Sequence, residues 1–160
     1  MKRIMVSLLW LGCLIGTASG ADTGWIEQSN RNAQILLDLQ ARYEPEDATA
    51  NGMLGHEAEV LDLKPRNSER QEADLAGAVE RLRALRPSAT DARVRQDLDI
   101  LIASAEQSRH SLELNRQLMV PYLDLGQMLF MGYQKLLHEG IAPKRQAQSL
   151  LRLRRYVGLE

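Results

Sequence analysis

The longest part of this chain without a helix-breaking residue lies between Pro87 and Pro121, and the stretch from Asp91 to Met119 falls within it. Apolar side chains recur along it at the three- and four-residue spacing of one helix face. We therefore expect one long helix here, with Asp91, Thr90 or Ser88 as its N-cap. The side chains expected to face the core are Val94, Leu98, Leu101, Ala105 and Leu112, with Ile100 and Ile102 widening the apolar face.

The remainder of the chain shows the same period, and its prolines and glycines mark the expected helix ends. The predicted helices cover residues 25–42, 67–85, 123–138 and 143–157, and a short helix runs from Pro45 to Gly52. Asn67 is the expected N-cap of the 67–85 helix, with Ser68 as the alternative. The apolar stripe of that helix is Leu75, Ala78, Val79, Leu82 and Leu85. Residues 53–66 are expected to form a loop, and no segment has the pattern of a strand.

Short connections between helices favour antiparallel neighbours, so the expected fold is all-α. We predict an antiparallel helical bundle of four longer helices plus one or two short ones, after a signal peptide. Aromatic residues make up only 4% of the chain, which suits packed helices better than a β-sandwich. The 123–138 helix is apolar on more than one face, and such a helix needs cover from both sides. The side chains outside its main stripe are Leu123, Met128, Phe130, Met131 and Leu137.

The first twenty residues have the layout of a secretory signal peptide. Lys2 and Arg3 precede an apolar run from Ile4 to Ile15, and small residues follow. The run is shorter than the roughly 20 residues that span a bilayer, which disfavours the alternative of an uncleaved anchor. We expect residues 1–20 to be removed, by cleavage after Gly20 or Ala21, and residues 21–160 to form one helical domain. The predicted location is periplasmic or secreted, in a bacterium.

Cysteine use and charge exclude several classes of function. Cys13, the only cysteine, lies in the predicted signal peptide, so the mature chain would have no disulfide, thiol nucleophile or thiolate metal ligand. Loss of Lys2 and Arg3 would take the formal net charge from −1 to −3. That value is too close to neutral to indicate a nucleic-acid or anionic-membrane partner. The basic run 151–156, with Lys144 and Arg145 upstream, is interpreted as charge that complements a helix C-terminus.

Histidines are the first candidates for metal chemistry, and two of the three precede a glutamate, in His56-Glu57 and His138-Glu139. A zinc-peptidase helix needs a second histidine four residues after the first. Those positions are Val60 and Ala142, so neither pair fits. His110 is expected on a solvated helix face. We predict no catalytic, metal-binding or cofactor-binding residue, and no cofactor.

The acidic residues Glu44, Glu46 and Asp47, and the pair Glu57 and Glu59, are candidates for acid–base chemistry only if burial or a partner shifts their pKa. For Glu46 and Asp47 the expected role is instead to complement the start of the short helix. Arg42 is expected to pair with an acidic residue on a neighbouring helix. No Gly-x-Ser-x-Gly elbow or glycine-rich phosphate loop is present.

Five motifs, spread over roughly residues 25–160, carry a resemblance to a known family. They are Tyr43-x-Pro45-Glu46-x-Ala48-Thr49-x-x-Gly52, Asp62-Leu63, Leu82-Arg83-Ala84-Leu85, Gln96-Asp97-Leu98-Asp99-Ile100-Leu101 and the stretch from Leu153 to Glu160. The chain resembles the N-terminal helical region of the bacterial "domain of unknown function 885" family.

The resemblance implies an exported protein of a family that looks like largely helical zinc metallopeptidases and whose members are several times longer. Their His-Glu-containing helix lies downstream of the matching region, so no metal or catalytic residue carries over. We therefore expect an exported, non-catalytic N-terminal region of a longer protein, truncated relative to the family. The alternative is a free-standing periplasmic helical binding or interaction module. In either case we expect the apolar 123–137 helix to mediate self-association or contact with a missing C-terminal region.

Overall fold

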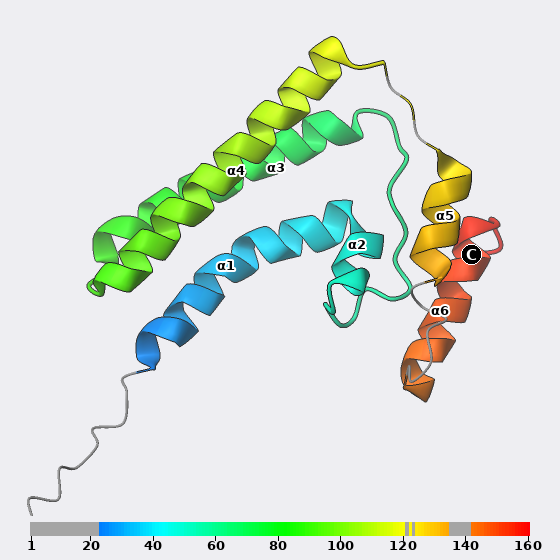
Figure 1. Cartoon of the computed structure of the whole chain (residues 1–160), viewed down its shortest axis with the longest axis horizontal. Helices are drawn as coiled ribbons and strands as arrows, with labels where there is room; N and C mark the ends of the chain where they lie inside the picture. The colour runs from blue at the N-terminus through cyan, green and yellow to red at the C-terminus, as the bar shows by residue number, and fades with distance from the viewer. Residues whose placement is uncertain (1–22, 121, 123, 135–141) are drawn as a thin grey trace, which may run out of the picture.

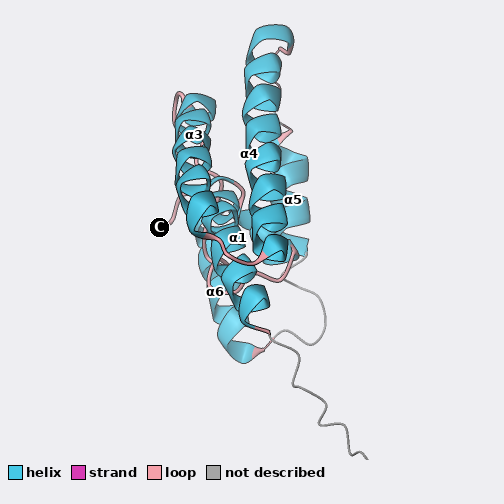
Figure 2. Cartoon of the chain, turned by 90° about the vertical axis from the view of Figure 1, so that its left-hand side faces the viewer, coloured by secondary structure: helices cyan, strands magenta, loops and turns pink. Residues whose placement is uncertain are grey.

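A computed structural model describes residues 23–120, 122, 124–134 and 142–160 (Figure 1). The helices are α1 (Gly24–Tyr43), α2 (Pro45–Ala50), α3 (Asn67–Leu85), α4 (Ala92–Leu118), α5 (Leu125–Gln134) and α6 (Pro143–Tyr156), with a 3-10 turn η1 (Arg86–Ser88) before α4. The described residues contain helices and loops but no strand (Figure 2), so the all-α prediction is confirmed. The predicted signal peptide, His138 and the end of the 123–138 helix lie outside the described residues.

Helices α1, α3 and α4 form a three-helix body, in which α3 runs antiparallel to both of the others (Figure 1). Two small apolar clusters fill it. Their buried members are Leu39, Tyr43, Leu75, Ala78, Val79 and Ala105 in one cluster and Leu82, Ala89, Val94 and Leu98 in the other. The predicted stripes of α3 and α4 supply most of these side chains, because the apolar face of an amphipathic helix is the face it buries.

Two side chains that were predicted to face the core are exposed. Leu85 is 39% exposed and Ile100 is 58% exposed. Leu85 occupies the last turn of α3, before the chain turns through η1 toward α4. Ile100 follows the buried Leu98 by two residues, which places it about 200° around the helix and on the opposite side.

The predicted N-cap of α4 is confirmed, whereas the predicted N-cap of α3 is wrong. Asp91 is the N-cap of α4, and its Oδ1 accepts a hydrogen bond from the backbone N–H of Arg93 at 2.8 Å. The prediction that Asn67 or Ser68 caps α3 is wrong, because Arg66 is the N-cap and makes no side-chain cap. The chain enters α3 through Arg66 in the left-handed region, at φ 62°, so Asn67 is already helical.

A tight corner joins α1 to α2. The Glu44 backbone N–H donates to the Gln40 carbonyl at 2.7 Å, and the buried Pro45 then occupies the first position of α2. Proline suits this position because its missing N–H would have no helical partner. The Thr49 hydroxyl donates back to the Pro45 carbonyl at 2.8 Å. The corner directs α2 and the following loop away from the three-helix body.

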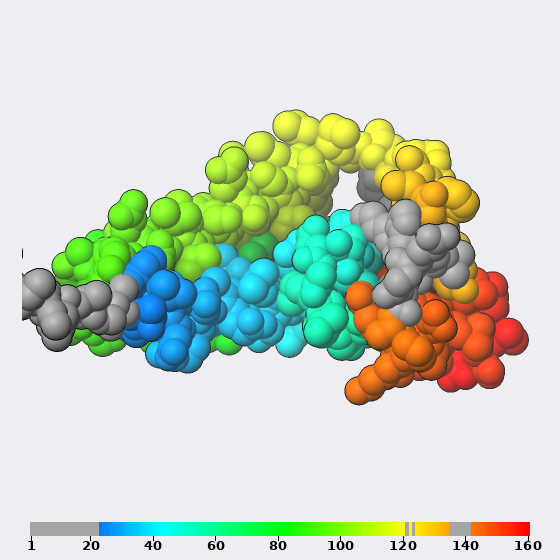
Figure 3. All heavy atoms as spheres, turned by 60° about the horizontal axis from the view of Figure 1, so that its bottom comes forward, coloured from blue at the N-terminus to red at the C-terminus, as the bar shows by residue number. Residues whose placement is uncertain are grey.

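Helices α5 and α6 pack against each other beyond the corner, and α5 also packs against α2 (Figure 1). The predicted bundle is therefore right for α1, α3 and α4, whereas α5 lies at the end of that group rather than along it. Figure 3 shows an opening between the C-terminal half of α4 and the α2 corner. Within the described part of the chain, no helix is both long enough and apolar enough to cross a bilayer.

Candidate functional site

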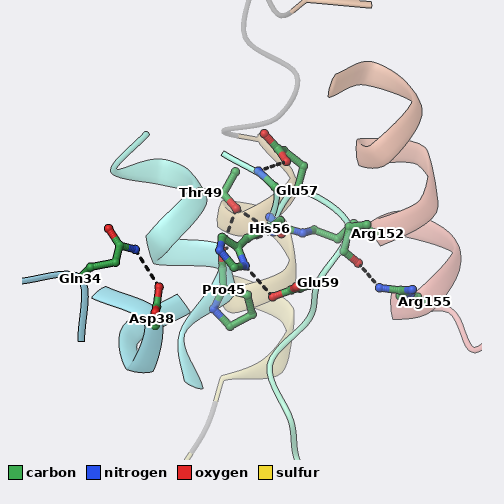
Figure 4. A network of polar contacts seen from close by, with 11 residues as sticks. Gln34, Asp38, Pro45, Thr49, His56, Glu57, Glu59, Arg152 and Arg155 are labelled. Carbon is green, nitrogen blue, oxygen red and sulfur yellow. Dashed lines mark hydrogen bonds and ion pairs between the residues drawn. The ribbon is translucent and has the colours of Figure 1, made fainter. Parts of the chain in front are cut away.

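The densest group of long-range polar contacts lies where α6 meets α2 and the following loop (Figure 4). We call this group the polar joint. It comprises Glu46, Thr49, His56, Glu57, Ala58, Arg145, Arg152, Arg155 and Tyr156. Arg145, Arg152 and Tyr156 follow one another at intervals of seven and four residues, which places them on one face of α6. Helix geometry thus aims these three side chains at the same neighbours.

Arg152 lies at the centre of the joint and is completely buried. Its Nη2 donates to the Thr49 hydroxyl oxygen at 3.0 Å, to the His56 carbonyl at 2.7 Å and, at 3.4 Å, to the Pro45 carbonyl. Its Nε and Nη1 have no hydrogen-bond acceptor among the described residues. Burial lowers the pKa of the Arg152 guanidinium, and the negative charges of Glu46, Glu57 and Glu59 act in the opposite direction.

Glu57 forms the second contact of the joint. Its carboxylate is almost fully buried and accepts from Arg145 Nε at 2.8 Å and from the Gly55 backbone N–H at 2.9 Å. Burial alone would raise the pKa of Glu57. The hydrogen bonds from the backbone N–H groups of Glu57 and Gly55, together with Arg145, outweigh burial and hold the pKa below its ordinary value. Glu57 is therefore a charged anchor for α6.

Glu46 joins three segments. Its Oε1 accepts from the Tyr156 hydroxyl at 2.8 Å and from the Leu61 backbone N–H at 3.0 Å. Burial, followed by the contact with Glu46, raises the pKa of Tyr156. The buried Gly132 of α5 lies against this pair: a Cβ added there would be 2.9 Å from both Glu46 Cγ and Tyr156 Oη. A residue without a side chain is therefore what allows α5 to approach so closely.

Arg155 makes the outermost contact of the joint and donates to the Ala58 carbonyl at 2.7 Å. The interpretation of the C-terminal basic run as helix-end charge fits Arg154 and Arg155, which lie in the last turn of α6. It is wrong for Arg152, which is buried in a tertiary contact. The signal that could have indicated this was the shared helix face of Arg152 with Ser149 and Tyr156.

The two described histidines, His56 and His110, lie on separate segments of the chain. His56 Nδ1 lies 2.9 Å from Glu59 Oε2, while its neighbour Glu57 turns to Arg145 instead. His110 is exposed on α4, as predicted. No group of three or more His, Cys, Asp or Glu side chains is placed to hold a metal ion within the described residues.

The expected pairing of Arg42 is confirmed, because its Nη1 donates to Asp74 Oδ2 on α3 at 2.9 Å. Of the acidic candidates at the α1–α2 corner, Glu44 has a pKa that is raised by burial and by the charge of Asp47. Its carboxylate lies at the rim of two cavities rather than in a catalytic pair.

Two cavities adjoin the corner. One, of about 420 Å³, is an open groove between α1, α3 and α4, with Leu36, Leu39 and Leu75 among its apolar lining residues and Gln40, Gln71 and Ser108 among its polar ones. The other, of about 170 Å³, lies between α2, the loop and α5. It is lined by Glu44, Glu46, Asp47, Leu61, Met128 and Met131, and by Gly132.

The polar joint is a structural contact between segments of the chain. Its carboxylates, hydroxyls and carbonyls bind groups from other segments of the same chain, so they hold α6 against α2 and the loop. Comparisons with known proteins add no relative, since no family model, curated protein or solved structure matches the chain.

Proposed function

We propose that this chain is an exported, non-catalytic helical region that works by contact with a further part of a longer, metallopeptidase-like protein. The observation that supports the proposal is a set of exposed apolar side chains close together in the sequence, which we call the apolar ridge. The ridge comprises Leu118, Met119, Val120, Tyr122, Leu125, Phe130 and Met131.

The ridge runs from the last turn of α4 through the linker into α5. Val120 is 86% exposed, Tyr122 is 84% exposed and Phe130 is 64% exposed. Several large apolar side chains exposed near one another favour an interaction site, because fully burying one large apolar side chain contributes about 1.5–3 kcal/mol. The resemblance indicates what would cover the ridge, namely the portion that follows this region in the longer proteins.

An activity assay tests the non-catalytic part of the proposal. The purified 21–160 chain is incubated with a mixed peptide substrate and zinc, with and without a chelator. We expect no hydrolysis above a buffer blank in either case. Zinc-dependent hydrolysis that the chelator abolishes would overturn the proposal.

The contact part is tested through the coding DNA beyond the codon for Glu160. We expect one reading frame to continue toward a His-Glu-x-x-His helix. The polypeptide from that frame, expressed separately, should bind the 21–160 chain. Phe130→Ser should weaken this binding at least about tenfold, which corresponds to about 1.4 kcal/mol. Leu54→Ser serves as the control, since Leu54 is 72% exposed but lies in the loop outside the ridge.

A second candidate function uses the same ridge. As a free-standing periplasmic interaction module, the chain would cover the ridge by self-association. Sedimentation velocity separates the two functions. A dimer that Phe130→Ser dissociates and Leu54→Ser does not would favour the free-standing module. A monomer at all concentrations would count against it. Mass spectrometry of periplasmic fractions, with a mature N-terminus after Gly20 or Ala21, tests the proposed location.

A further inference from the structure

We propose that α5 and α6 form a detachable unit, which leaves α2 and the loop while the three-helix body stays folded. Arg152 is the residue that holds this unit in place, and we call it the latch. The inference goes beyond the proposed function and does not depend on it. It concerns how the two parts of the chain are held together.

Among the described residues, the two apolar clusters contain no side chain from α5 or α6. Every buried and partly buried member of the two apolar clusters belongs to α1, α3 or α4 or to the residue Ala89 between α3 and α4. The buried residues described in α5 and α6 are Gly132, Ser149 and Arg152, none of which has a large apolar side chain. The three-helix body therefore does not need α5 or α6 to fill its core, and it can remain folded without them.

Polar contacts hold the unit in place. Arg145, Arg152, Arg155 and Tyr156 each reach across from α6 to α2 or the loop. Water can replace each of these partners when the unit leaves, whereas it cannot replace the contacts of an apolar core. A polar interface of this kind opens more readily than the body does.

Arg152 makes the docking both specific and reversible. Its Nη2 reaches acceptors in α2 and in the loop, so it fixes the position of α6 relative to both segments. Its Nε and Nη1 are buried with no acceptor in the part of the chain that the structure describes, and these groups regain hydration when α6 leaves. The lowered pKa of the guanidinium has the same cause, since burial disfavours its charge. The incomplete compensation of this buried charge weakens the docking of α6 and so favours its release.

Release has a defined structural consequence. The cavity of about 170 Å³ has one wall in α5, formed by Met128, Met131 and Gly132. When α5 leaves, Glu46 and Leu61 on the opposite wall become accessible to solvent or to another polypeptide. While it is docked, the unit formed by α5 and α6 covers this side of the α1–α2 corner, and we call it the strap.

Hydrogen exchange of the unmodified 21–160 chain, followed by mass spectrometry, is the first test. We expect the amides of α5 and α6 to share one exchange rate, at least about 100-fold faster than the rate around Leu82 and Leu98. Low urea should accelerate the slow amides but leave the fast ones nearly unchanged, because local release exposes little surface. A single rate and a single urea dependence for all helices would overturn the proposal. Independent rates for α5 and α6 would also overturn it, since they indicate fraying.

A matched pair of variants then tests the latch. Arg152→Ala should raise exchange in both α5 and α6 at least about tenfold and leave α3 and α4 unchanged. Arg154→Ala removes the same charge from the same helix. The Arg154 side chain forms an ion pair with Glu160, just beyond the end of α6, so the exchange pattern of this variant should match the unmodified chain. Equal effects of the two variants, or loss of the whole helical circular dichroism signal in Arg152→Ala, would overturn the role of Arg152.

Thr49→Val tests the latch from the opposite side. It removes the side-chain acceptor of Arg152 in α2 and leaves the α6 sequence intact. We expect faster exchange in α5 and α6 by at least about threefold, again without a change around Leu82 and Leu98. Unchanged exchange in α6 would show that the contact of Arg152 with Thr49 does not hold the strap.

Discussion

The hydroxyl of Tyr156 donates a hydrogen bond of 2.8 Å to Oε1 of Glu46, and so joins the last turn of α6 to the first turn of α2. The same carboxylate oxygen accepts from the Leu61 backbone N–H. Glu46 was predicted to complement a helix start, and it does lie in the first turn of α2. Its carboxylate also connects the α1–α2 corner, the loop and α6, which no local pattern indicates.

Gly132 makes room for this contact, so Gly132→Ala should weaken it. An alanine in a helix normally stabilises the helix by about 0.5–1 kcal/mol relative to glycine. Here the added Cβ would stand 2.9 Å from both Glu46 Cγ and Tyr156 Oη. Overpacking of this kind costs about 1–3 kcal/mol. We expect faster hydrogen exchange in α6, measured by mass spectrometry.

Gly77→Ala is the matched control for Gly132→Ala. Gly77 lies in α3, and a Cβ at this position would have no atom within 4 Å. We expect it to raise the free energy of unfolding by about 0.5–1 kcal/mol, measured by urea denaturation. If Gly132→Ala left exchange in α6 unchanged, the close approach of α5 to Glu46 and Tyr156 would be wrong.

The N-cap of α4 should make the free energy of unfolding depend on pH in the acidic range. Hydrogen bonds from the side chain and backbone N–H of Arg93 lower the pKa of Asp91 from 3.8 to about 2. Because this pKa is below that of the unfolded chain, the ionised cap stabilises the fold fully above about pH 4. Its contribution is lost as the pH falls from about 4 to about 2.

Asp91→Asn isolates this effect, since asparagine keeps a cap acceptor but does not ionise. The difference in unfolding free energy between the unmodified chain and Asp91→Asn should shrink as the pH falls from about 4 to about 2. Urea denaturation of both proteins at several pH values measures it, and the other carboxylates cancel in the difference. A difference that stays constant over this range would contradict the lowered pKa of Asp91.

Tyr43 and Arg42 provide a comparison of a buried with an exposed donor, because both bind Asp74 Oδ2, at 2.8 and 2.9 Å. Tyr43 is buried, whereas the Arg42 side chain is 66% exposed. Tyr43→Phe should lower the free energy of unfolding by about 1 kcal/mol, the usual net value of a hydrogen bond. Arg42→Met should change it by less than about 0.5 kcal/mol, because solvent screens exposed ion pairs.

Thermal and urea denaturation of the two variants measures these changes. Equal decreases in the free energy of unfolding for Tyr43→Phe and Arg42→Met would show that burial does not set the strength of the two contacts with Asp74.

Leu98 and Ile100 lie two residues apart on α4 but in opposite environments. Leu98 is fully buried between the helices of the body, and Ile100 points outward. Leu98→Ala should destabilise the protein by about 2–5 kcal/mol through lost apolar contacts and the cavity left behind. Ile100→Ala should stay within about 0.5 kcal/mol of the unmodified chain. Urea denaturation measures the free energy of unfolding of both variants. A decrease for Ile100→Ala similar to that for Leu98→Ala would contradict the orientation of α4.

The helices of the three-helix body, and most of the side chains that they bury, were predictable from the order of the residues. Leu75, Ala78, Val79 and Leu82 were predicted from their spacing, because the contact face of a helix is a local, periodic property. Pro45 at the start of α2 and Asp91 as the cap of α4 were equally readable, since both act through neighbouring backbone groups. The resemblance to a family and the predicted export remain predictions.

The positions of α5 and α6, and the charges that they bury, depend on contacts between segments far apart in the sequence. Arg152 looks like an ordinary surface arginine in the sequence, because arginine is rarely buried and its run of basic neighbours suits a helix end. Its burial depends on Thr49 and His56, which are about a hundred residues away along the chain. The helix face that Arg152 shares with Ser149 and Tyr156 is a local signal, but it does not indicate which distant residues this face meets. It forms because the proline corner turns α2 toward α6, and because Gly132 allows α5 to pack close to both.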